Sequence, residues 1–404
     1  MAKILIISDA HTPPLYGVRA RFFADYLKRK GHTVLFVSEH YPDDNRQTEK
    51  PIYPHKRVRI YSLNPVLRFL KRLLIWLADI VFPCKERMFS HGVRRILEER
   101  KFDVVICSAF HSFPLLTART IARELDAKLI VDVRDMAEQA GGYVYHQYHP
   151  RWLAPLLKCK QSVEIRRRNE VLRQADAITT VSPWHVEQLR KYNDNVNLVY
   201  NGYDADAVLP RAEKQKRFEI VYLGKYYGEP LQSVDNFYSV MSRLVSGEGL
   251  DISIVFYTDE ESRTRLSEYM PPLLAEHIRF EGYVPRKCVP KILSEASASL
   301  VITNKERMEG PHGIMTTKFF EALGAGVPVL CTRSDGSYLA ELIRKTRAGV
   351  TDDDNDEFAD YIRQLYAQWK QTGTTSAGSD PQWQKLLSRQ SQSHELERLI
   401  EKIC

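Results

Sequence analysis

The sequence has little of what marks a cross-linked, zinc-bound or membrane-spanning chain. Its six cysteines are scattered over 404 residues and form no C-x-x-C pair, which disfavours both a disulfide framework and a zinc site. No apolar run reaches the ~18 residues that a membrane-spanning helix needs. The apolar run that follows Met1 is too short for a secretory signal. We therefore expect a cytoplasmic protein without a disulfide framework or a cysteine-based zinc site.

Repeats, low-complexity blocks and a dinucleotide fingerprint are also missing. A buried strand at 4–7, a helix at 18–30 and a second strand at 33–37 form a βαβ unit, but Gly17 is the only glycine in its first loop. The G-x-G-x-x-G pattern of nicotinamide-binding proteins is therefore absent, which disfavours a nicotinamide enzyme.

Apolar strands alternate with helical patterns along the whole chain, which predicts an α/β fold. The length favours two domains. The charged segment 208–217 is the best linker, between an N-terminal domain at 1–207 and a C-terminal domain at 218–380. A closing helix at 381–404 could pack back on the N-terminal domain. Two doubly wound, Rossmann-like domains of this kind would face each other across a cleft, where ligands preferentially bind.

Charge is distributed unevenly over the two halves. Residues 1–200 hold 33 Lys+Arg against 21 Asp+Glu, a net of +12, whereas the remainder holds 25 against 30, a net of −5. The first half therefore favours an anionic partner. Within it, a helix is predicted to begin after Asn64 and to end before Pro83, with Arg68, Lys71 and Arg72 beside an apolar run. Such a helix at 66–82 fits either an anionic membrane surface or an ordinary core position with a solvated basic edge.

The stretch at 313–330 predicts a loop, a short helix and a buried strand. Thr316 and Thr317 supply a helix N-cap. Lys318 and Glu321 are three residues apart, so they share one face of the first turn. A lysine and a carboxylate at a helix start beside a parallel sheet suit a phosphorylated ligand with hydroxyl groups, although a surface ion pair is the simpler interpretation.

Several segments taken in order resemble the GT-B glycosyltransferases of family 4. They are the first strand with its Gly17 loop, 131–135, 175–182, 199–204, 221–225 and 317–323. The resemblance covers almost the whole chain and implies a retaining, metal-independent hexosyl- or glycosyltransferase that uses a nucleotide-diphosphate sugar. It also implies that the C-terminal domain binds the donor and that the N-terminal domain faces the acceptor.

The resemblance places donor contacts at Gly17, Gly224, Lys225, Thr317, Lys318 and Glu321. Glu321 would hold the ribose hydroxyls, and Lys225 and Lys318 would contact the diphosphate and act in catalysis. The family's first motif glutamate is replaced by Gly313. Glu306, Glu309 or His312 could reach the sugar instead, and the sequence does not select among them.

On the acceptor side, the candidates are His111, Arg19, Asp132, Arg134 and Asp135. His111 follows a strand and is the best catalytic candidate for a polar contact to the sugar or acceptor. Arg19 lies in a first helical turn, where a nearby anion would offset the unfavourable macrodipole. Asp132, Arg134 and Asp135 end a strand, where either acceptor contact or an internal ion network is expected.

We therefore predict a cytoplasmic glycosyltransferase, on the inner face of the cytoplasmic membrane, that acts on a glycan or lipid-linked acceptor in surface polysaccharide or lipopolysaccharide synthesis. One rival is a nucleotide-sugar epimerase of the same fold, and another is a non-catalytic glycan-binding relative. Nucleic-acid binding is disfavoured, because the basic residues are not interleaved with an aromatic platform.

Overall fold

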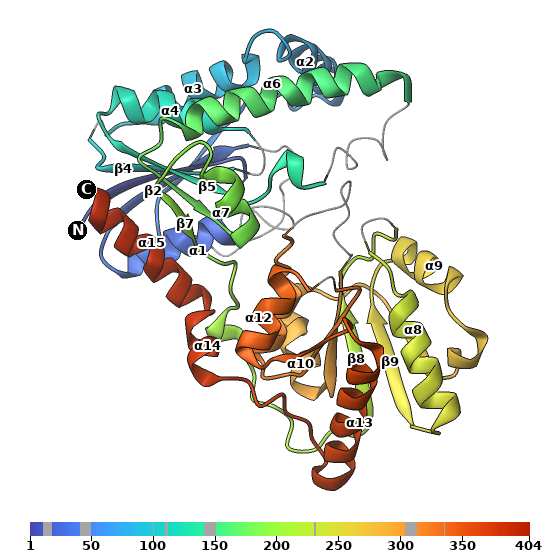
Figure 1. Cartoon of the computed structure of the whole chain (residues 1–404). Helices are drawn as coiled ribbons and strands as arrows, with labels where there is room; N and C mark the ends of the chain where they lie inside the picture. Colours follow the sequence, from blue (N-terminus) through green and yellow to red (C-terminus); the bar gives the residue numbers. More distant parts are fainter. Residues whose placement is uncertain are drawn as a thin grey trace. The chain divides into compact units, whose positions relative to one another are not determined.

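The computed structural model describes residues 1–10, 18–40, 50–99, 101–109, 112–140, 151–229, 232–303, 313–334 and 336–404. Two compact units divide the chain. The first comprises Met1–Tyr200 and Ser393–Cys404, and the second comprises Asn201–Gln392. Each unit has a parallel sheet flanked by helices (Figure 1), which confirms the α/β class with two Rossmann-like domains.

The first sheet has seven parallel strands in the order β3-β2-β1-β4-β5-β6-β7. Its inner strands are almost wholly buried, which explains their continuous apolar sequences. The strands are β1 (Lys3–Ser8), β2 (Thr33–Glu39), β3 (His55–Val58), β4 (Val104–Ala109), β5 (Lys128–Val133), β6 (Ala177–Thr180) and β7 (Val196–Leu198).

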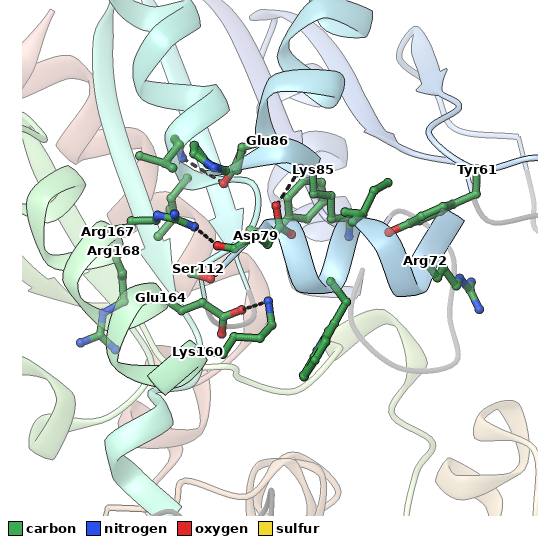
Figure 2. Close-up of a pocket in the computed structure, with 16 residues that line it drawn as sticks. Tyr61, Arg72, Asp79, Lys85, Glu86, Ser112, Lys160, Glu164, Arg167 and Arg168 are labelled. Atoms are coloured by element: carbon green, nitrogen blue, oxygen red, sulfur yellow. Dashed lines mark hydrogen bonds and ion pairs between the residues drawn. The ribbon is translucent and has the colours of Figure 1, made fainter. Parts of the chain in front are cut away.

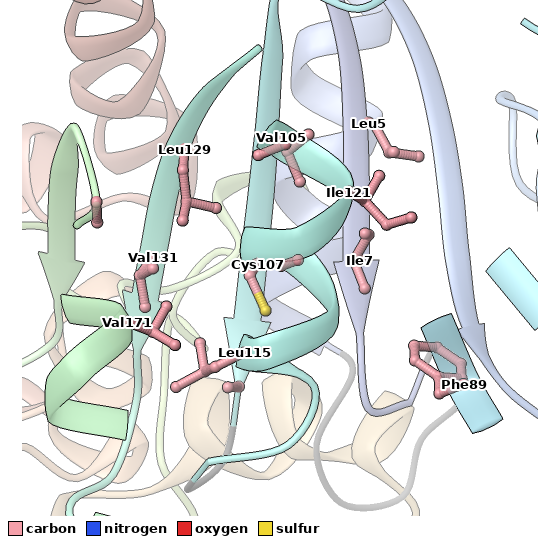
Figure 3. Packing of buried hydrophobic residues seen from close by; sticks show 14 of the residues in the cluster. Leu5, Ile7, Phe89, Val105, Cys107, Leu115, Ile121, Leu129, Val131 and Val171 are labelled. Carbon is pink, nitrogen blue, oxygen red and sulfur yellow. The ribbon is translucent and has the colours of Figure 1, made fainter. Parts of the chain in front are cut away.

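Helices cover both faces of this sheet. One face packs against a cluster that includes Phe89, Leu115, Ile121 and Val171 from three helices (Figure 3). The other packs against α1 and the end of the chain, where Leu396 and its neighbours complete the core. The helices of this unit are α1 (Val18–Arg29), α2 (Pro65–Ala78), α3 (Cys84–Ile96), α4 (Leu115–Glu124), α6 (Ala154–Leu172), α7 (Pro183–Leu189) and most of α15 (Arg389–Ile403).

The second sheet has six parallel strands in the order β10-β9-β8-β11-β12-β13. Its strands are β8 (Phe218–Leu223), β9 (Ile252–Tyr257), β10 (Ile278–Glu281), β11 (Ala298–Ile302), β12 (Val329–Thr332) and β13 (Gly349–Thr351). Its helices are α8 (Asp235–Ser242), a π-helical turn (Arg243–Gly247), α9 (Glu260–Glu268), α10 (Val289–Glu295), α11 (Thr317–Gly324), α12 (Tyr338–Thr346), α13 (Asn355–Thr372) and α14 (Pro381–Leu386). Short 3-10 turns occur at Ala137–Ala140, Arg151–Leu153, Ala205–Ala207, Pro272–Leu274 and Arg286–Cys288.

Segment 208–217, expected to be a linker, packs within the second unit. The Arg211 guanidinium donates to the Leu293 carbonyl at 2.8 Å and to the Thr375 carbonyl at 3.2 Å. At the other end of the chain, the last turns of α15 lie in the core of the first unit, and the unit boundary falls at Ser393. The chain therefore passes between the units twice.

Helix α2 exposes its apolar side to solvent, unlike an ordinary surface helix. Its N-cap is Asn64, as expected, whose side chain accepts from the amides of Val66 and Leu67, but the helix ends at Ala78 rather than near Pro83. Ile75 is its one buried residue. Seven apolar side chains are exposed instead: Val66, Leu67, Phe69, Leu70, Leu73, Leu74 and Leu77.

The polar side of α2 lies against the body of the first unit. The Lys71 ammonium donates to the Ile60 carbonyl at 2.6 Å, and the Arg72 guanidinium lies 5.2 Å from the Tyr61 ring centre. A core helix would turn its apolar stripe inward, so the core alternative for this helix was wrong. No helix among the described residues is long and apolar enough to cross a membrane.

Candidate functional site

The predicted donor residues of the second unit lie at the carboxyl edge of its sheet. Gly224 and Lys225 directly follow β8, and Thr317, Lys318 and Glu321 lie on α11, which connects β11 to β12. In parallel sheets the strand ends and the starts of the following helices share one edge. The fold therefore brings together two motifs that lie far apart in the sequence.

Lys318 lies across the backbone of Gly224. A Cβ atom at position 224 would be 3.0 Å from the Lys318 Cε and 3.3 Å from its Nζ, and the Gly224 φ of +122° is open mainly to glycine. The Thr258 hydroxyl donates to the Gly224 carbonyl at 2.8 Å and helps to fix this turn. A glycine is therefore required here both by its backbone angle and by the lysine that covers it.

The Lys318 ammonium is held in a partly desolvated position. It lies 5.2 Å from the centre of the buried Tyr222 ring. Burial lowers the pKa of Lys318, and Glu321 opposes that shift. The residue lies in the first turn of α11, whose N-cap Thr316 accepts from the Lys318 amide at 3.4 Å, while Thr317 is exposed. A cation and a helix N-terminus together favour an anionic ligand.

Glu321 lies one turn further along α11, and a residue that the sequence did not single out lies against it. The Glu321 Oε1 is 3.5 Å from Nη2 of Arg286. Arg286 belongs to the turn after β10, where Tyr283 is 68% exposed. The sequence pattern Gly-Tyr-Val-Pro-Arg after a strand could have indicated that Arg286 lies at the sheet edge. Arg286 thus joins the candidate donor residues.

The ammonium groups of Lys225 and Lys318 lie against different residues. The Lys225 ammonium pairs with Glu261 of α9 at 2.9 Å and lies 5.7 Å from the Tyr227 ring centre. A diphosphate contact by Lys225 stays a prediction, and it requires this exposed ion pair to open. Gly313, which replaces the missing glutamate, is buried with a φ of +56°, a left-handed conformation that favours glycine.

A second network at the same edge was not predicted. The buried Asp352, after β13, accepts from the Thr332 hydroxyl at 2.8 Å and from the amides of Arg333 and Ser334 at 2.6 and 2.8 Å. The Arg333 guanidinium pairs with Glu229 at 2.6 Å. These bonds fix the loop after β12, so Asp352 is a positioning residue for this edge.

In the first unit, Arg19 and Asp132 form the internal network that was one of the two alternatives. The Arg19 Nε lies 3.1 Å from both carboxylate oxygens of Asp132, and its Nη1 donates to the Tyr200 carbonyl at 2.8 Å. The hydroxyls of Ser108 and Thr179 also donate to this carboxylate. Asp132 is thus the anion that offsets the helix dipole at Arg19.

Burial alone would raise the pKa of Asp132, but Arg19 and the two hydroxyls lower it below its usual value. Because Asp132 has no solvent exposure and Arg19 is 8% exposed, acceptor contact through either residue stays a prediction that requires the network to open.

Arg134 and Asp135 behave differently from each other. The Arg134 Nη2 lies 3.1 Å from the Asp9 carboxylate, and Arg134 is 9% exposed. Asp135 is half-buried and makes no hydrogen bond or ion pair with another described residue. Burial raises its pKa to about 6, with Arg134 opposing and Asp9 adding to the shift. Of the predicted acceptor-side residues that the structure describes, Asp135 is therefore the best placed to meet a ligand.

Gly17 and His111 lie outside the described residues, as do Glu306, Glu309 and His312. The part of the chain that the structure describes contains no group of three or more His, Cys, Asp or Glu side chains that could hold a metal ion.

We predict that Arg19→Met destabilises the first unit by ~3–5 kcal/mol, because the substitution leaves the buried Asp132 carboxylate unpaired. The double variant Arg19→Met/Asp132→Asn should recover much of this loss, since the neutral amide oxygen still accepts from one of the hydroxyls of Ser108 and Thr179 and its NH2 group can donate to the other. Thermal and urea unfolding of both variants and the wild type measure these differences in unfolding free energy. Equal destabilisation by the single and the double variant would contradict the paired-charge account.

Both units match models of glycosyltransferase domains. Residues 16–202 match the "Glycosyl transferase 4-like domain", and residues 217–368 match "Glycosyl transferases group 1". No curated protein matches this sequence.

Solved structures of similar fold cover the whole chain. Sucrose-phosphate synthase from Thermosynechococcus elongatus has a TM-score of 0.66 at 13% identity, covering 99% of each chain. Anabaena HepE in complex with UDP has a TM-score of 0.65 at 11% identity, covering 99% of this chain and 100% of its own. The lipopolysaccharide outer core galactosyltransferase WaaB has a TM-score of 0.60 at 15% identity, covering 100% of both. Together, the two domain matches and the shared two-domain fold place the chain in the group 1 glycosyltransferases, enzymes of the GT-B fold.

Proposed function

We propose that this glycosyltransferase moves a sugar, with retention of anomeric configuration, from a nucleotide-diphosphate donor to a membrane-linked glycan. The observation that carries the donor half is the position of Lys318, across Gly224 and one turn before Glu321 on α11. Solved relatives of the same fold include HepE with UDP and with UDP-glucose, which supports a nucleotide sugar as donor.

The reaction needs stabilisation of the diphosphate as it departs. Lys318 and the amides at the start of α11 offer positive charge that is in place before reaction, so little reorganisation is required. Glu321 accepts hydrogen bonds from the ribose hydroxyls, with Arg286 holding its carboxylate. In this proposal the leaving phosphate accepts the proton of the acceptor hydroxyl, and no metal ion takes part.

The acceptor half rests on the first unit. Asp135 offers a carboxylate with no partner among the described residues at the end of β5. It would accept a hydrogen bond from an acceptor hydroxyl. WaaB, a lipopolysaccharide galactosyltransferase, shares the fold over its whole length. That likeness supports an acceptor in surface polysaccharide or lipopolysaccharide synthesis.

Membrane contact through 66–82 is supported by the inverted orientation of α2. Beyond the seven exposed apolar residues of α2, Leu63, Val81 and Phe82 are also more than half exposed. Burial of a whole aliphatic or aromatic side chain contributes ~1.5–3 kcal/mol, so a face of this size favours an apolar medium. The net charge of +12 over residues 1–200 favours anionic headgroups. The enzyme would thus work at the cytoplasmic face of the membrane.

Glu321→Ala should raise the donor KM about tenfold or more, because a hydrogen bond to a charged group contributes ~1.5–3 kcal/mol. Glu341→Ala is the matched control, since Glu341 is an exposed helical glutamate whose ion pair among the described residues is with Lys345 at 3.6 Å. Steady-state transfer kinetics with a panel of nucleotide sugars measure both variants. Unchanged donor kinetics in Glu321→Ala would remove Glu321 from the site.

Transfer should depend on the charge state of Asp135. Its pKa of about 6 lies above the ordinary value, so the carboxylate that accepts a hydrogen bond is lost as pH falls through about 6. We expect kcat/KM to decline below that pH in the wild type, and Asp135→Asn to lower kcat/KM and abolish this decline. An Asp135→Asn enzyme with the wild-type pH profile would exclude the role.

Membrane binding should depend on the leucine face of α2 more than on its basic residues. We predict that Leu70→Ser/Leu73→Ser/Leu77→Ser weakens binding to mixed phosphatidylcholine–phosphatidylglycerol vesicles at least ~30-fold. Leu209→Ser/Leu273→Ser/Leu386→Ser is the control, because these leucines are 42–48% exposed and the α2 leucines are 45–48% exposed. Equal losses in the two triple variants, measured by vesicle flotation, would argue against docking through α2.

A further inference from the structure

A cavity of about 410 Å³ lies under the inward side of α2. Its walls come from α2, the start of α3, the turn that leads into α4, and α6 (Figure 2). All of its lining residues belong to the first unit, and none belongs to the donor site. Ser112 and Phe113 bring the cavity to the loop after β4, close in sequence to His111.

Cations outnumber carboxylates on the cavity wall. Five basic and three acidic side chains line it: Arg72, Lys85, Lys160, Arg167 and Arg168 against Asp79, Glu86 and Glu164. Figure 2 shows Arg72 at one end, beside Tyr61, and Arg167 and Arg168 at the other, on α6. The cations therefore surround the space instead of forming a single cluster.

Two of these cations have no carboxylate partner among the described residues. The Arg167 guanidinium donates to two carbonyl oxygens at the end of α2, those of Asp79 at 2.6 Å and Val81 at 3.1 Å. Arg72 is exposed and stacks on the Tyr61 ring. Arg168 and Lys85 are paired with Glu138 and Glu39, which are not part of the lining. Lys160 is paired at 2.9 Å with Glu164, which also lines the cavity, so a phosphate would compete with that carboxylate for the ammonium. An anion in the cavity would meet more cationic than anionic groups.

One of the lining carboxyls is easily neutralised. Burial raises the pKa of Glu86 to about 7, against hydrogen bonds from Thr117 and Leu116 that act in the opposite direction. The Glu86 carboxyl therefore becomes neutral at a higher pH than an ordinary glutamate. This further reduces repulsion of an anionic ligand.

We propose that the cavity binds the phosphate group of a membrane lipid, with Arg72 and Lys160 as its main cationic contacts. Arginine and lysine in a partly enclosed site make charge-assisted hydrogen bonds to phosphate oxygens. The source is a lipid, because α2 and its C-cap line the cavity with both polar and apolar residues, Arg72, Ile75, Trp76 and Asp79, and α2 exposes its leucines on the other side. An apolar chain could follow that leucine face while the head enters the cavity.

This site is distinct from general attraction to a charged surface, since it predicts preference for one headgroup. The inference rests on the proposed function only for the membrane contact of α2. The binding itself does not depend on sugar transfer.

The test compares flotation with phosphatidylcholine vesicles containing either phosphatidic acid, a phosphomonoester, or phosphatidylglycerol, a phosphodiester, at matched zeta potential. The wild type should bind phosphatidic acid vesicles about tenfold more tightly, because an exposed phosphomonoester fits a discrete site. Arg72→Gln/Lys160→Gln should abolish that preference. The control Lys158→Gln/Arg166→Gln removes two charges from exposed positions of α6 outside the cavity and should keep it.

A wild type without headgroup preference, or a preference that both double variants keep or both lose, would overturn the proposal. Arg72→Gln alone guards against misfolding of the double variant, because Arg72 is exposed and its described contact is the Tyr61 ring. Arg72→Gln alone should lower the preference for phosphatidic acid vesicles in part. Unaltered preference in a folded Arg72→Gln protein would remove Arg72 from the site.

Inorganic phosphate distinguishes a lipid from a soluble ligand. At constant ionic strength, millimolar inorganic phosphate should leave most of the vesicle binding in place, since it competes for the cations but brings no apolar chain to α2. Displacement of the protein by inorganic phosphate would assign the cavity to free phosphate and overturn the lipid proposal. The leucine-face variant should weaken binding to both vesicle types, so failure of α2 docking and failure of the phosphate site give different results.

Discussion

The donor site depends on one constraint, the passage of the Lys318 side chain across Gly224 onto the Tyr222 ring. It joins the strand end of β8 to the first turn of α11 and places a partly desolvated cation at a helix N-terminus. Burial that lowers the pKa of Lys318 carries a free-energy cost, which an anionic ligand would offset. Such a cation is expected at a binding site more than on an ordinary surface.

In the first unit, most charged groups at the sheet edge are paired with one another. At the carboxyl edge of the first sheet, Arg19 and Asp132 satisfy each other, and Arg134 is tied to Asp9. These ion pairs hold that edge in place, and the Asp135 carboxylate remains available to a ligand. On α2 the usual orientation is reversed, with polar groups turned to the protein and leucines to the outside. A braced edge, an exposed apolar helix and a basic cavity beneath it are together consistent with an acceptor held at a membrane.

Local patterns in the sequence predicted the alternation of strands and helices, the N-cap at Asn64 and the shared face of Lys318 and Glu321. They could not predict contacts made only by the fold. Arg19 and Asp132 are 113 residues apart, and Arg286 meets Glu321 only because β10 ends at the same sheet edge. Periodicity also revealed the apolar stripe of α2 but not its direction, because an amphipathic helix has the same sequence pattern whichever side faces the core.

The central claim is that the edge around Lys318 and Glu321 binds the diphosphate of a nucleotide sugar. Hydrogen–deuterium exchange of the whole chain with a panel of nucleoside diphosphates tests it most directly, since it reports where the ligand protects backbone amides. The account predicts that at least one diphosphate slows exchange within 313–324 and 282–288, with little change in 65–78. Protection confined to the first unit, or none with any diphosphate, would contradict it.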